Sequence, residues 1–254
     1  MKIHSVFSAL LLILVASCAS RKEILYMQDA KDVGNAEINY QTPTIQPNDI
    51  LKINVETLIP EAAVPYNKGT LQGMQPQNLQ VLQLDGYLVS LENTIKFPVL
   101  GEISTKDLTT MQLEEDLKQR LVDGGHLLNP KVNVRLINAK VTILGEVNQP
   151  GTYTFTEQNI TVLQALGYAG DLTINGRRND VLMTREADGI RKVTHLDLTS
   201  AEFMNSDYYF IRPNDVIVVN QNNPRVKNAG FIGDIGTVLT IASLALSVTI
   251  LLTR

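Results

Sequence analysis

The fold is decided by Ile45-Gln46-Pro47-Asn48-Asp49-Ile50-Leu51-Lys52-Ile53-Asn54, a stretch that is echoed near the other end of the chain. The echo reads Ile211-Arg212-Pro213-Asn214-Asp215-Val216-Ile217-Val218-Val219-Asn220, and five of the ten positions are identical. In both copies Pro-Asn-Asp predicts a turn, because proline fixes φ and the Asx side chains close backbone hydrogen bonds. The aliphatic run after each turn predicts a strand. We interpret both Pro-Asn-Asp segments as structural turns: Pro47, Asn48 and Asp49, then Pro213, Asn214 and Asp215.

A second echo places a glycine after an apolar run twice, in Leu100-Gly101-Glu102-Ile103 and Leu144-Gly145-Glu146-Val147. We expect each glycine to end a strand and a helix to follow each of them. Pro150 and Gly151 predict a turn between strands. Strands are expected over residues 131–136, 140–144, 152–155 and 180–185.

Both predicted helices begin with a capping-box pattern. The first starts near Thr109 with Gln112 three residues on and stops at Gly124-Gly125, and the second starts near Thr161 with Gln164 and stops by Gly170. Each presents an apolar face, formed by Leu113, Leu117 and Leu121 in the first and by Val162, Leu163 and Leu166 in the second. Together these elements predict an α+β fold with two small sheet-and-helix modules.

Composition narrows the classes of function. The chain has 254 residues, 44% hydrophobic and 19% charged, which is enough for one large or two small cores. A formal net charge of −4 argues against a nucleic-acid binder, since the phosphate backbone requires a basic face. A single cysteine excludes an internal disulfide framework and a Cys-rich zinc site. We expect no cofactor and no metal.

The N-terminus is typical of an exported protein. Residues 1–17 combine Lys2, an apolar run of eleven residues and a small-residue cleavage region, which together predict a signal peptide. The only cysteine, Cys18, follows Leu14-Val15-Ala16-Ser17, and this segment resembles the bacterial lipobox, in which the cysteine is acylated. Residue 19 is alanine rather than the aspartate that favours inner-membrane retention in similar lipoboxes, so the resemblance implies an outer-membrane lipoprotein. Residues 18–43 are expected to be a lipidated tether.

The C-terminal region predicts a second membrane attachment. Residues 235–252 contain no charge and would form a helix about 27 Å long, close to the thickness of a bilayer core. We expect a linker over 221–233 and a transmembrane helix over 234–254. One narrow stripe of that helix is small and polar: Gly236, Thr240, Ser243 and Ser247. The stripe is either a seam between packed helices or a surface that lines a water-filled pore.

The candidates for catalysis are weak. His126 follows a glycine pair at a helix end, where capping or solvent exposure is the simpler role. His195, Asp197 and Ser200 form only a superficial triad, because triad members rarely stand so close in sequence. The carboxylates at positions 114–116 are typical of the solvent-exposed face of a helix. We therefore predict that the protein is not an enzyme and has no catalytic residue.

Taken in order, these segments resemble the polysaccharide export domain of outer-membrane capsule and exopolysaccharide exporters of the Wza type, over residues 44–138. Residues 139–220, with Gly145, Pro150 and Gly151, are similar to a soluble-ligand-binding β-grasp (SLBB) domain. The resemblance implies a ring of identical subunits in the outer membrane, with periplasmic domains, an α-helical pore, the exported polysaccharide as cargo, and an inner-membrane polysaccharide co-polymerase or tyrosine kinase as partner. It favours the pore-lining interpretation of the polar stripe.

A glycan-binding or scaffolding lipoprotein without a pore is the alternative. Sugar-stacking aromatics would be expected of it, yet the chain has no Trp, and Tyr208-Tyr209-Phe210 is predicted to begin the last strand.

Overall fold

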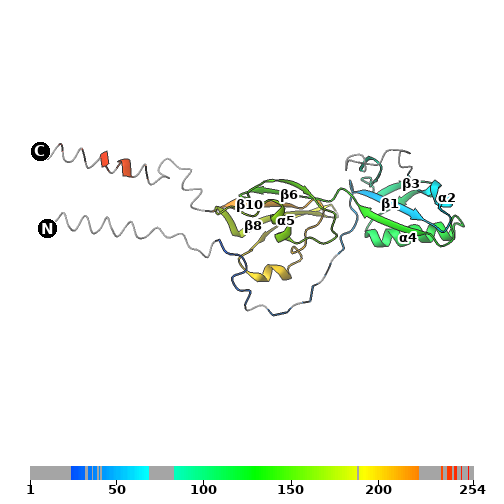
Figure 1. The fold of residues 1–254 in the computed structure, drawn as a ribbon, viewed down its shortest axis with the longest axis horizontal. Coiled ribbons are helices and arrows are strands. Elements are labelled where there is room, and N and C mark those ends of the chain that lie inside the picture. Colours follow the sequence, from blue (N-terminus) through cyan, green and yellow to red (C-terminus); the bar gives the residue numbers. More distant parts are fainter. Residues whose placement is uncertain are drawn as a thin grey trace.

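A computed structural model describes residues 24–31, 34–35, 37–38, 40, 42–68, 83–187 and 189–222, together with eight positions of a C-terminal helix. The predicted signal peptide, Cys18 and most of the predicted linker and span lie outside these residues. The described chain forms two units that lie end to end along the long axis (Figure 1). We call residues 42–138 the first unit and residues 139–222 the second unit.

The first unit is a small antiparallel sheet covered by one helix. The sheet has the order β2-β1-β5, a separate hairpin pairs β3 with β4, and α4 packs beside β5 (Figure 1). The predicted leucine face is confirmed, because Leu113, Leu117 and Leu121 are fully buried. The bounds are β1 Ile50–Glu56, α2 Pro60–Ala63, η2 Val64–Tyr66, β2 Tyr87–Leu88, β3 Thr94–Phe97, β4 Gly101–Ser104, α4 Thr110–Asp123 and β5 Lys131–Leu136.

The second unit is a five-stranded sheet with the order β7-β6-β10-β8-β9. The central strand β10 is parallel to β6 and antiparallel to β8. The helix α5 contributes Val162, Ala165 and Leu166 to the core, whereas Leu163 is only partly buried. The bounds are β6 Lys140–Gly145, β7 Gly151–Thr154, α5 Val162–Tyr168, β8 Gly176–Ala187, β9 Ile190–Leu196, η3 Ala201–Asn205 and β10 Val216–Gln221. The α+β class is confirmed.

Both helices start as the capping boxes predict. The Thr109 hydroxyl accepts a hydrogen bond from Gln112 N–H at 3.2 Å, and the Gln112 side chain accepts one from Thr109 N–H at 2.8 Å. Thr161 and Gln164 repeat the arrangement at 3.1 and 2.8 Å. These reciprocal bonds satisfy backbone donors that the first helical turn leaves open, so the start of each helix is set locally.

Two predictions about strands were wrong, and a third strand is longer than predicted. Gly101 begins β4 instead of ending a strand, because the turn that precedes it joins β3 to β4 in a hairpin. The strand predicted over 180–185 is present but longer, from Gly176 to Ala187, because residues 181–187 pair with β9 and Gly176 pairs with Gln221 of β10. Residues 208–210 do not begin the last strand: Phe210 only bridges to Thr161, and β10 starts at Val216.

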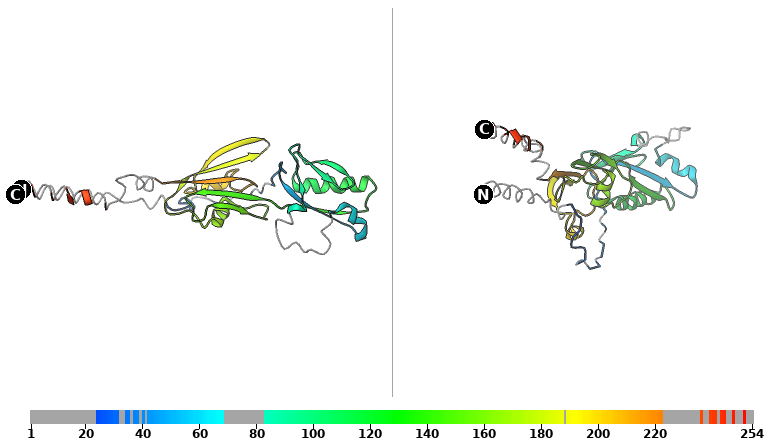
Figure 2. Two further views of the ribbon diagram at one scale, coloured as in Figure 1. Left: turned by 90° about the horizontal axis from the view of Figure 1, so that it is seen from above. Right: turned by 60° about the vertical axis from the view of Figure 1, so that its left-hand side comes forward.

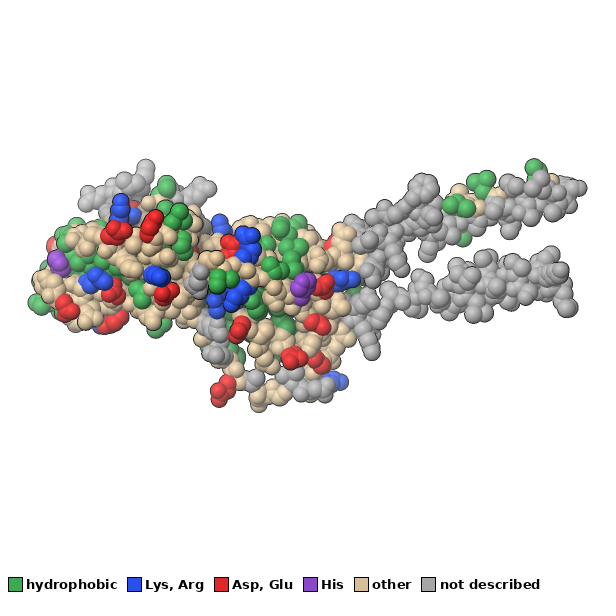
Figure 3. All heavy atoms as spheres, turned by 180° about the vertical axis from the view of Figure 1, so that it is seen from behind, with side chains coloured by type: hydrophobic (Ala, Val, Ile, Leu, Met, Phe, Trp, Pro, Cys, Tyr) green, Lys and Arg blue, Asp and Glu red, His purple; other side chains and the backbone are tan. Residues whose placement is uncertain are grey.

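No helix among the described residues has the length and apolar character needed to cross a membrane. The transmembrane helix expected over 234–254 thus finds no support in the described positions and stays a prediction. On the face of the molecule shown in Figure 3, basic and acidic side chains are interspersed over both units.

Candidate functional site

The two Pro-Asn-Asp segments form nearly identical turns. Asn48 and Asn214 both adopt left-handed backbone conformations, with φ of 71° and 68°. The Asp49 carboxylate accepts a hydrogen bond from Gln46 N–H at 2.8 Å, and the Asp215 carboxylate accepts one from Arg212 N–H at 2.7 Å. The repeated residues therefore build the same Asx-closed turn at the start of β1 and of β10.

The two aspartates differ in their counter-ion. Asp215 is fully buried and is held by Arg185, whose Nη2 and Nε lie 2.7 and 3.0 Å from its oxygens. Asp49 is just as buried, with 3% of its surface exposed, but the ion pairs among the described residues do not include it. Burial raises the pKa of both carboxyls, that of Asp49 to about 6, and only at Asp215 does a neighbouring guanidinium, that of Arg185, oppose the shift. The turn that contains Asp49 thus holds a buried carboxylate without a counter-ion among the described residues.

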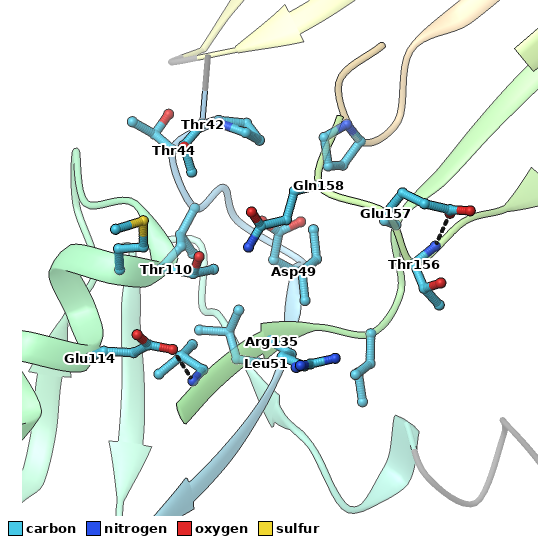
Figure 4. Close-up of a pocket in the computed structure, with 18 of the residues that line it drawn as sticks. Thr42, Thr44, Asp49, Leu51, Thr110, Glu114, Arg135, Thr156, Glu157 and Gln158 are labelled. Atoms are coloured by element: carbon cyan, nitrogen blue, oxygen red, sulfur yellow. Dashed lines mark hydrogen bonds between the residues drawn. The ribbon is translucent and has the colours of Figure 1, made fainter. Parts of the chain in front are cut away.

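Asp49 lines a cavity of about 620 Å³ between the two units (Figure 4). The first unit contributes β5 and the first turn of α4, and the second unit contributes the loop of residues 155–158 that follows β7, together with Pro213. The walls are largely apolar, with carboxylates and hydroxyls set among them. It is a concave site shared by both units, of the size that small ligands occupy.

Gly145 is required by a close backbone approach. Its φ is +88°, and a Cβ atom placed there would lie 2.1 Å from the carbonyl oxygen of Val219 in β10. Only glycine fits, because any side chain would push β6 away from its parallel partner. Gly151, after Pro150, opens β7 opposite Ile143, so this segment is the β6-β7 hairpin.

Residues 24–31, which we call the N-terminal strap, are bound to the second unit. Met27 N–H donates to Leu198 O at 3.0 Å and Gln28 N–H to Thr199 O at 2.7 Å. Asp29 accepts hydrogen bonds from Ser200 Oγ at 2.6 Å and from Ala201 N–H at 2.5 Å. The strap lies within the tether predicted over 18–43, and backbone pairing and polar contacts fix this part of it to a folded surface.

Tyr26 anchors the strap to a loop at one end of the second unit. Its hydroxyl donates to Asp171, its ring lies over the Arg178 guanidinium at 5.2 Å, and burial raises its pKa. Arg178 is itself buried and donates to Thr173 O and Gly176 O at 3.1 and 3.0 Å. The loop, the arginine and the strap thus form one connected contact.

The last described residue of the second unit meets the same loop. Asn222 N–H donates to Asn175 O at 2.7 Å, and its side chain donates to Ile174 O at 3.2 Å. We call residues 171–175 the exit loop, because the chain enters the second unit beside it through the strap and leaves beside it through Asn222. Both exits lie at the end of the second unit that is remote from the first unit (Figures 1 and 2).

The described positions of the C-terminal helix include the whole polar stripe. Its hydroxyls bond to the backbone of their own helix: Thr240 Oγ1 to Gly236 O at 2.8 Å, Ser243 Oγ to Thr240 O at 2.9 Å, and Ser247 Oγ to Ser243 O at 2.8 Å. Such bonds satisfy the hydroxyl proton without a neighbour, so the stripe tolerates either a helix seam or a water-filled space.

The structure does not assemble the superficial triad. His195 pairs with Asp180 at 2.5 Å rather than with Asp197, whose carboxylate accepts from Thr199 N–H at 2.8 Å. The hydrogen bond from His195 lowers the pKa of Asp180. Ser200 donates to Asp29 in the strap. His126 stands edge-on to the ring of Tyr66, with centroids 5.9 Å apart.

The three consecutive acidic residues of α4, at positions 114–116, make different contacts. Glu114 accepts from Val134 N–H at 2.7 Å, whereas Glu115 and Asp116 pair with Lys118 and Arg120 along the exposed helix face. Across the part of the chain that the structure describes, no three His, Cys, Asp or Glu residues gather as a metal site would require.

Sequence reasoning missed the strap residues and the uncompensated state of Asp49. The one available signal for the strap was Ile24-Leu25-Tyr26-Met27, a run of four apolar residues in a polar segment. For Asp49 the sequence carried no such signal, because both copies of the repeat contain the aspartate and the arginine that pairs with Asp215 lies 30 residues away in sequence.

Comparison with known proteins places these features in a family. Residues 38–137 match the family described as "Polysaccharide biosynthesis/export protein", and residues 139–219 match the SLBB domain. The chain is 28% identical over 195 residues to the capsule polysaccharide export outer membrane protein CtrA of Neisseria meningitidis serogroup A, covering 76% of this chain and 48% of that protein.

It is also 27% identical over 106 residues to the EPS I polysaccharide export outer membrane protein EpsA of Ralstonia nicotianae, covering 40% of this chain and 27% of that protein. The chain spans about half the length of the CtrA proteins it matches, and less of EpsA. The two domain matches together cover more than two thirds of the residues, in the order found in the structure. The chain therefore carries a polysaccharide biosynthesis/export domain over residues 38–137, followed by an SLBB domain over residues 139–219.

Proposed function

We propose that this protein is an outer-membrane lipoprotein whose copies form a channel that exports capsular polysaccharide or exopolysaccharide from the periplasm to the cell surface. The observation that carries the proposal is the meeting of both chain exits at the exit loop. A lipid at Cys18 and a membrane helix over 234–254 would attach the second unit to one bilayer from a single point.

Chain length makes this attachment close. Six residue steps separate Cys18 from Ile24 at the start of the strap, which is about 21 Å of fully extended chain. Because the strap is bound to the second unit, that unit would lie against the membrane. The first unit would then project away from it into the periplasm, where an inner-membrane partner such as a polysaccharide co-polymerase or its tyrosine kinase could reach it.

A channel follows from the chemistry of the cargo. A hydrated glycan cannot cross hydrocarbon unaided, because each polar group stripped of water costs several kcal/mol. A closed ring of copies supplies an aqueous route, provided that each copy has two different contact faces. The polar stripe at Gly236, Thr240, Ser243 and Ser247 would face that route, and its self-satisfied hydroxyls need no neighbour.

The stripe offers a direct test in cells. Replacing Thr240, Ser243 and Ser247 together by leucine should abolish surface polysaccharide while the protein stays in the outer membrane. Thr249→Leu is the matched control, because helical periodicity alone sets Thr249 on the opposite side, and it should leave export intact.

Normal export by the triple variant would argue against a pore lined by this stripe. Labelling with palmitate should mark Cys18, and the detergent-extracted protein should sediment as an oligomer. A monomer at all concentrations would contradict the channel itself.

A further inference from the structure

The cavity between the two units is lined by a carboxylate, that of Asp49, which has no cationic partner among the described residues. Only 3% of the Asp49 surface is exposed, and among the described residues the one hydrogen-bond donor to its carboxylate is the backbone N–H of Gln46. A buried carboxylate normally has a cationic partner, because an unpaired ion in a poorly solvated place is strongly unfavourable. Here the carboxylate lines an open cavity (Figure 4).

The second turn shows which partner such an aspartate takes. Around Asp215 the guanidinium of Arg185 donates to the carboxylate through Nε and Nη2, and it also donates to Asp207 O and Phe210 O at 3.0 and 2.7 Å. A planar guanidinium matches a carboxylate with two parallel bonds, which a single ammonium cannot do. The repeat therefore contains one filled example of the arrangement and one example without the cation.

The remaining lining fits the same chemistry. Glu114 and Glu157 also line the cavity, and the carboxylate of each accepts a hydrogen bond from a backbone N–H, that of Val134 at 2.7 Å and that of Thr156 at 3.0 Å. Arg135 is the one basic residue in the described lining, so carboxylates outnumber it. Apolar walls, including Met111 and Phe155, would cover the stem of a ligand while its charged head meets Asp49.

We propose that this cavity binds the guanidinium group of a ligand. That group would pair with the Asp49 carboxylate as the guanidinium of Arg185 pairs with Asp215. The group belongs either to a small alkylguanidinium compound or to an arginine side chain of another polypeptide. Because both units contribute to the walls, an occupied cavity would tie the first unit to the second. The site stands independently of the channel proposal.

Binding is tested on the detergent-extracted full chain by titration calorimetry. Ethylguanidinium should bind saturably at millimolar concentration, whereas ethylurea, its neutral isostere, should not. Asp49→Asn should weaken binding of ethylguanidinium at least tenfold. Glu102→Gln, which changes an exposed carboxylate outside the cavity, should leave binding unchanged.

A capped Gly-Arg-Gly peptide distinguishes the two sources of the ligand. Tighter binding of the peptide than of ethylguanidinium would identify a polypeptide arginine, and binding of ethylguanidinium alone would identify a small compound. Equal binding of ethylguanidinium to the wild type and to Asp49→Asn would overturn the proposal, as would an absence of saturable binding by the wild type. Thermal unfolding of each variant verifies that it is folded.

Discussion

Asp49→Asn should make this protein more stable near neutral pH. Burial raises the pKa of Asp49 from an ordinary 3.8 to about 6, so the folded state disfavours the ionised carboxylate. The difference corresponds to about 3 kcal/mol of unfolding free energy, an upper bound that applies above the folded pKa. As the pH falls through about 6 toward 3.8, the folded protein takes up the proton first and this cost disappears.

Asparagine keeps the shape and an oxygen that can accept the Gln46 N–H, but it carries no charge. Thermal unfolding followed by circular dichroism should therefore show a midpoint raised by about 6 to 12 °C at about pH 7 and little change at about pH 4. The variant would gain stability while losing the proposed ligand, a trade that functional sites commonly show.

Asp215→Asn is the matched control, because it makes the same change at the equivalent position of the second Pro-Asn-Asp turn. It would leave the buried Arg185 without its carboxylate, which costs about 3 to 5 kcal/mol, so the midpoint should fall. The two variants should thus move in opposite directions at neutral pH. If both destabilise the protein, or if the gain from Asp49→Asn is equal at the two pH values, the reasoning about an uncompensated carboxylate is refuted.

Three further changes probe the fold and the strap. Tyr26→Phe removes the hydroxyl bond to Asp171 and should speed amide hydrogen exchange in the strap about fivefold, measured by mass spectrometry, with the core of the second unit unchanged. Gly145→Ala should destabilise the protein by at least about 2 kcal/mol in thermal unfolding, because the added Cβ would collide with Val219 O. Gly101 has a similar φ but open space around it, so Gly101→Ala should cost only about 1 kcal/mol. Equal losses in the two variants would contradict the close approach at Gly145. Leu117→Ala in α4 should cost about 2 to 5 kcal/mol in the same assay, and a loss below about 1 kcal/mol would show that its site collapses or is not core.

Short sequence patterns predicted correctly the features that depend on residues close together in the sequence. The capping boxes located the start of α4 and α5, since the bonds that set these ends span three residues. The strand that begins at Gly101 was misplaced because a hairpin depends on its partner, and the same apolar run is compatible with a strand on either side of the glycine. β9 was not predicted because its exposed edge position removes the alternation that marks a half-buried strand.

The candidate site was predicted in part for the same reason. The Pro-Asn-Asp turns were recognised from consecutive residues, but the partner of Asp215 lies 30 residues away and the strap contacts lie about 145 to 172 residues away. Contacts at that separation leave no periodic signal in the sequence. The cavity, which needs both units to exist, could be found only in three dimensions.

The position of β10 in its sheet has a mechanical consequence. The chain leaves the second unit from the end of β10, and this strand is bonded to β6 on one side and to β8 on the other. A pull on the chain beyond Asn222 is therefore directed along the strand, and the hydrogen bonds of two ladders must shear together instead of opening one after another. If the segment beyond Asn222 is held in a membrane, as we propose, tension on it would load β10 together with both of its neighbouring strands.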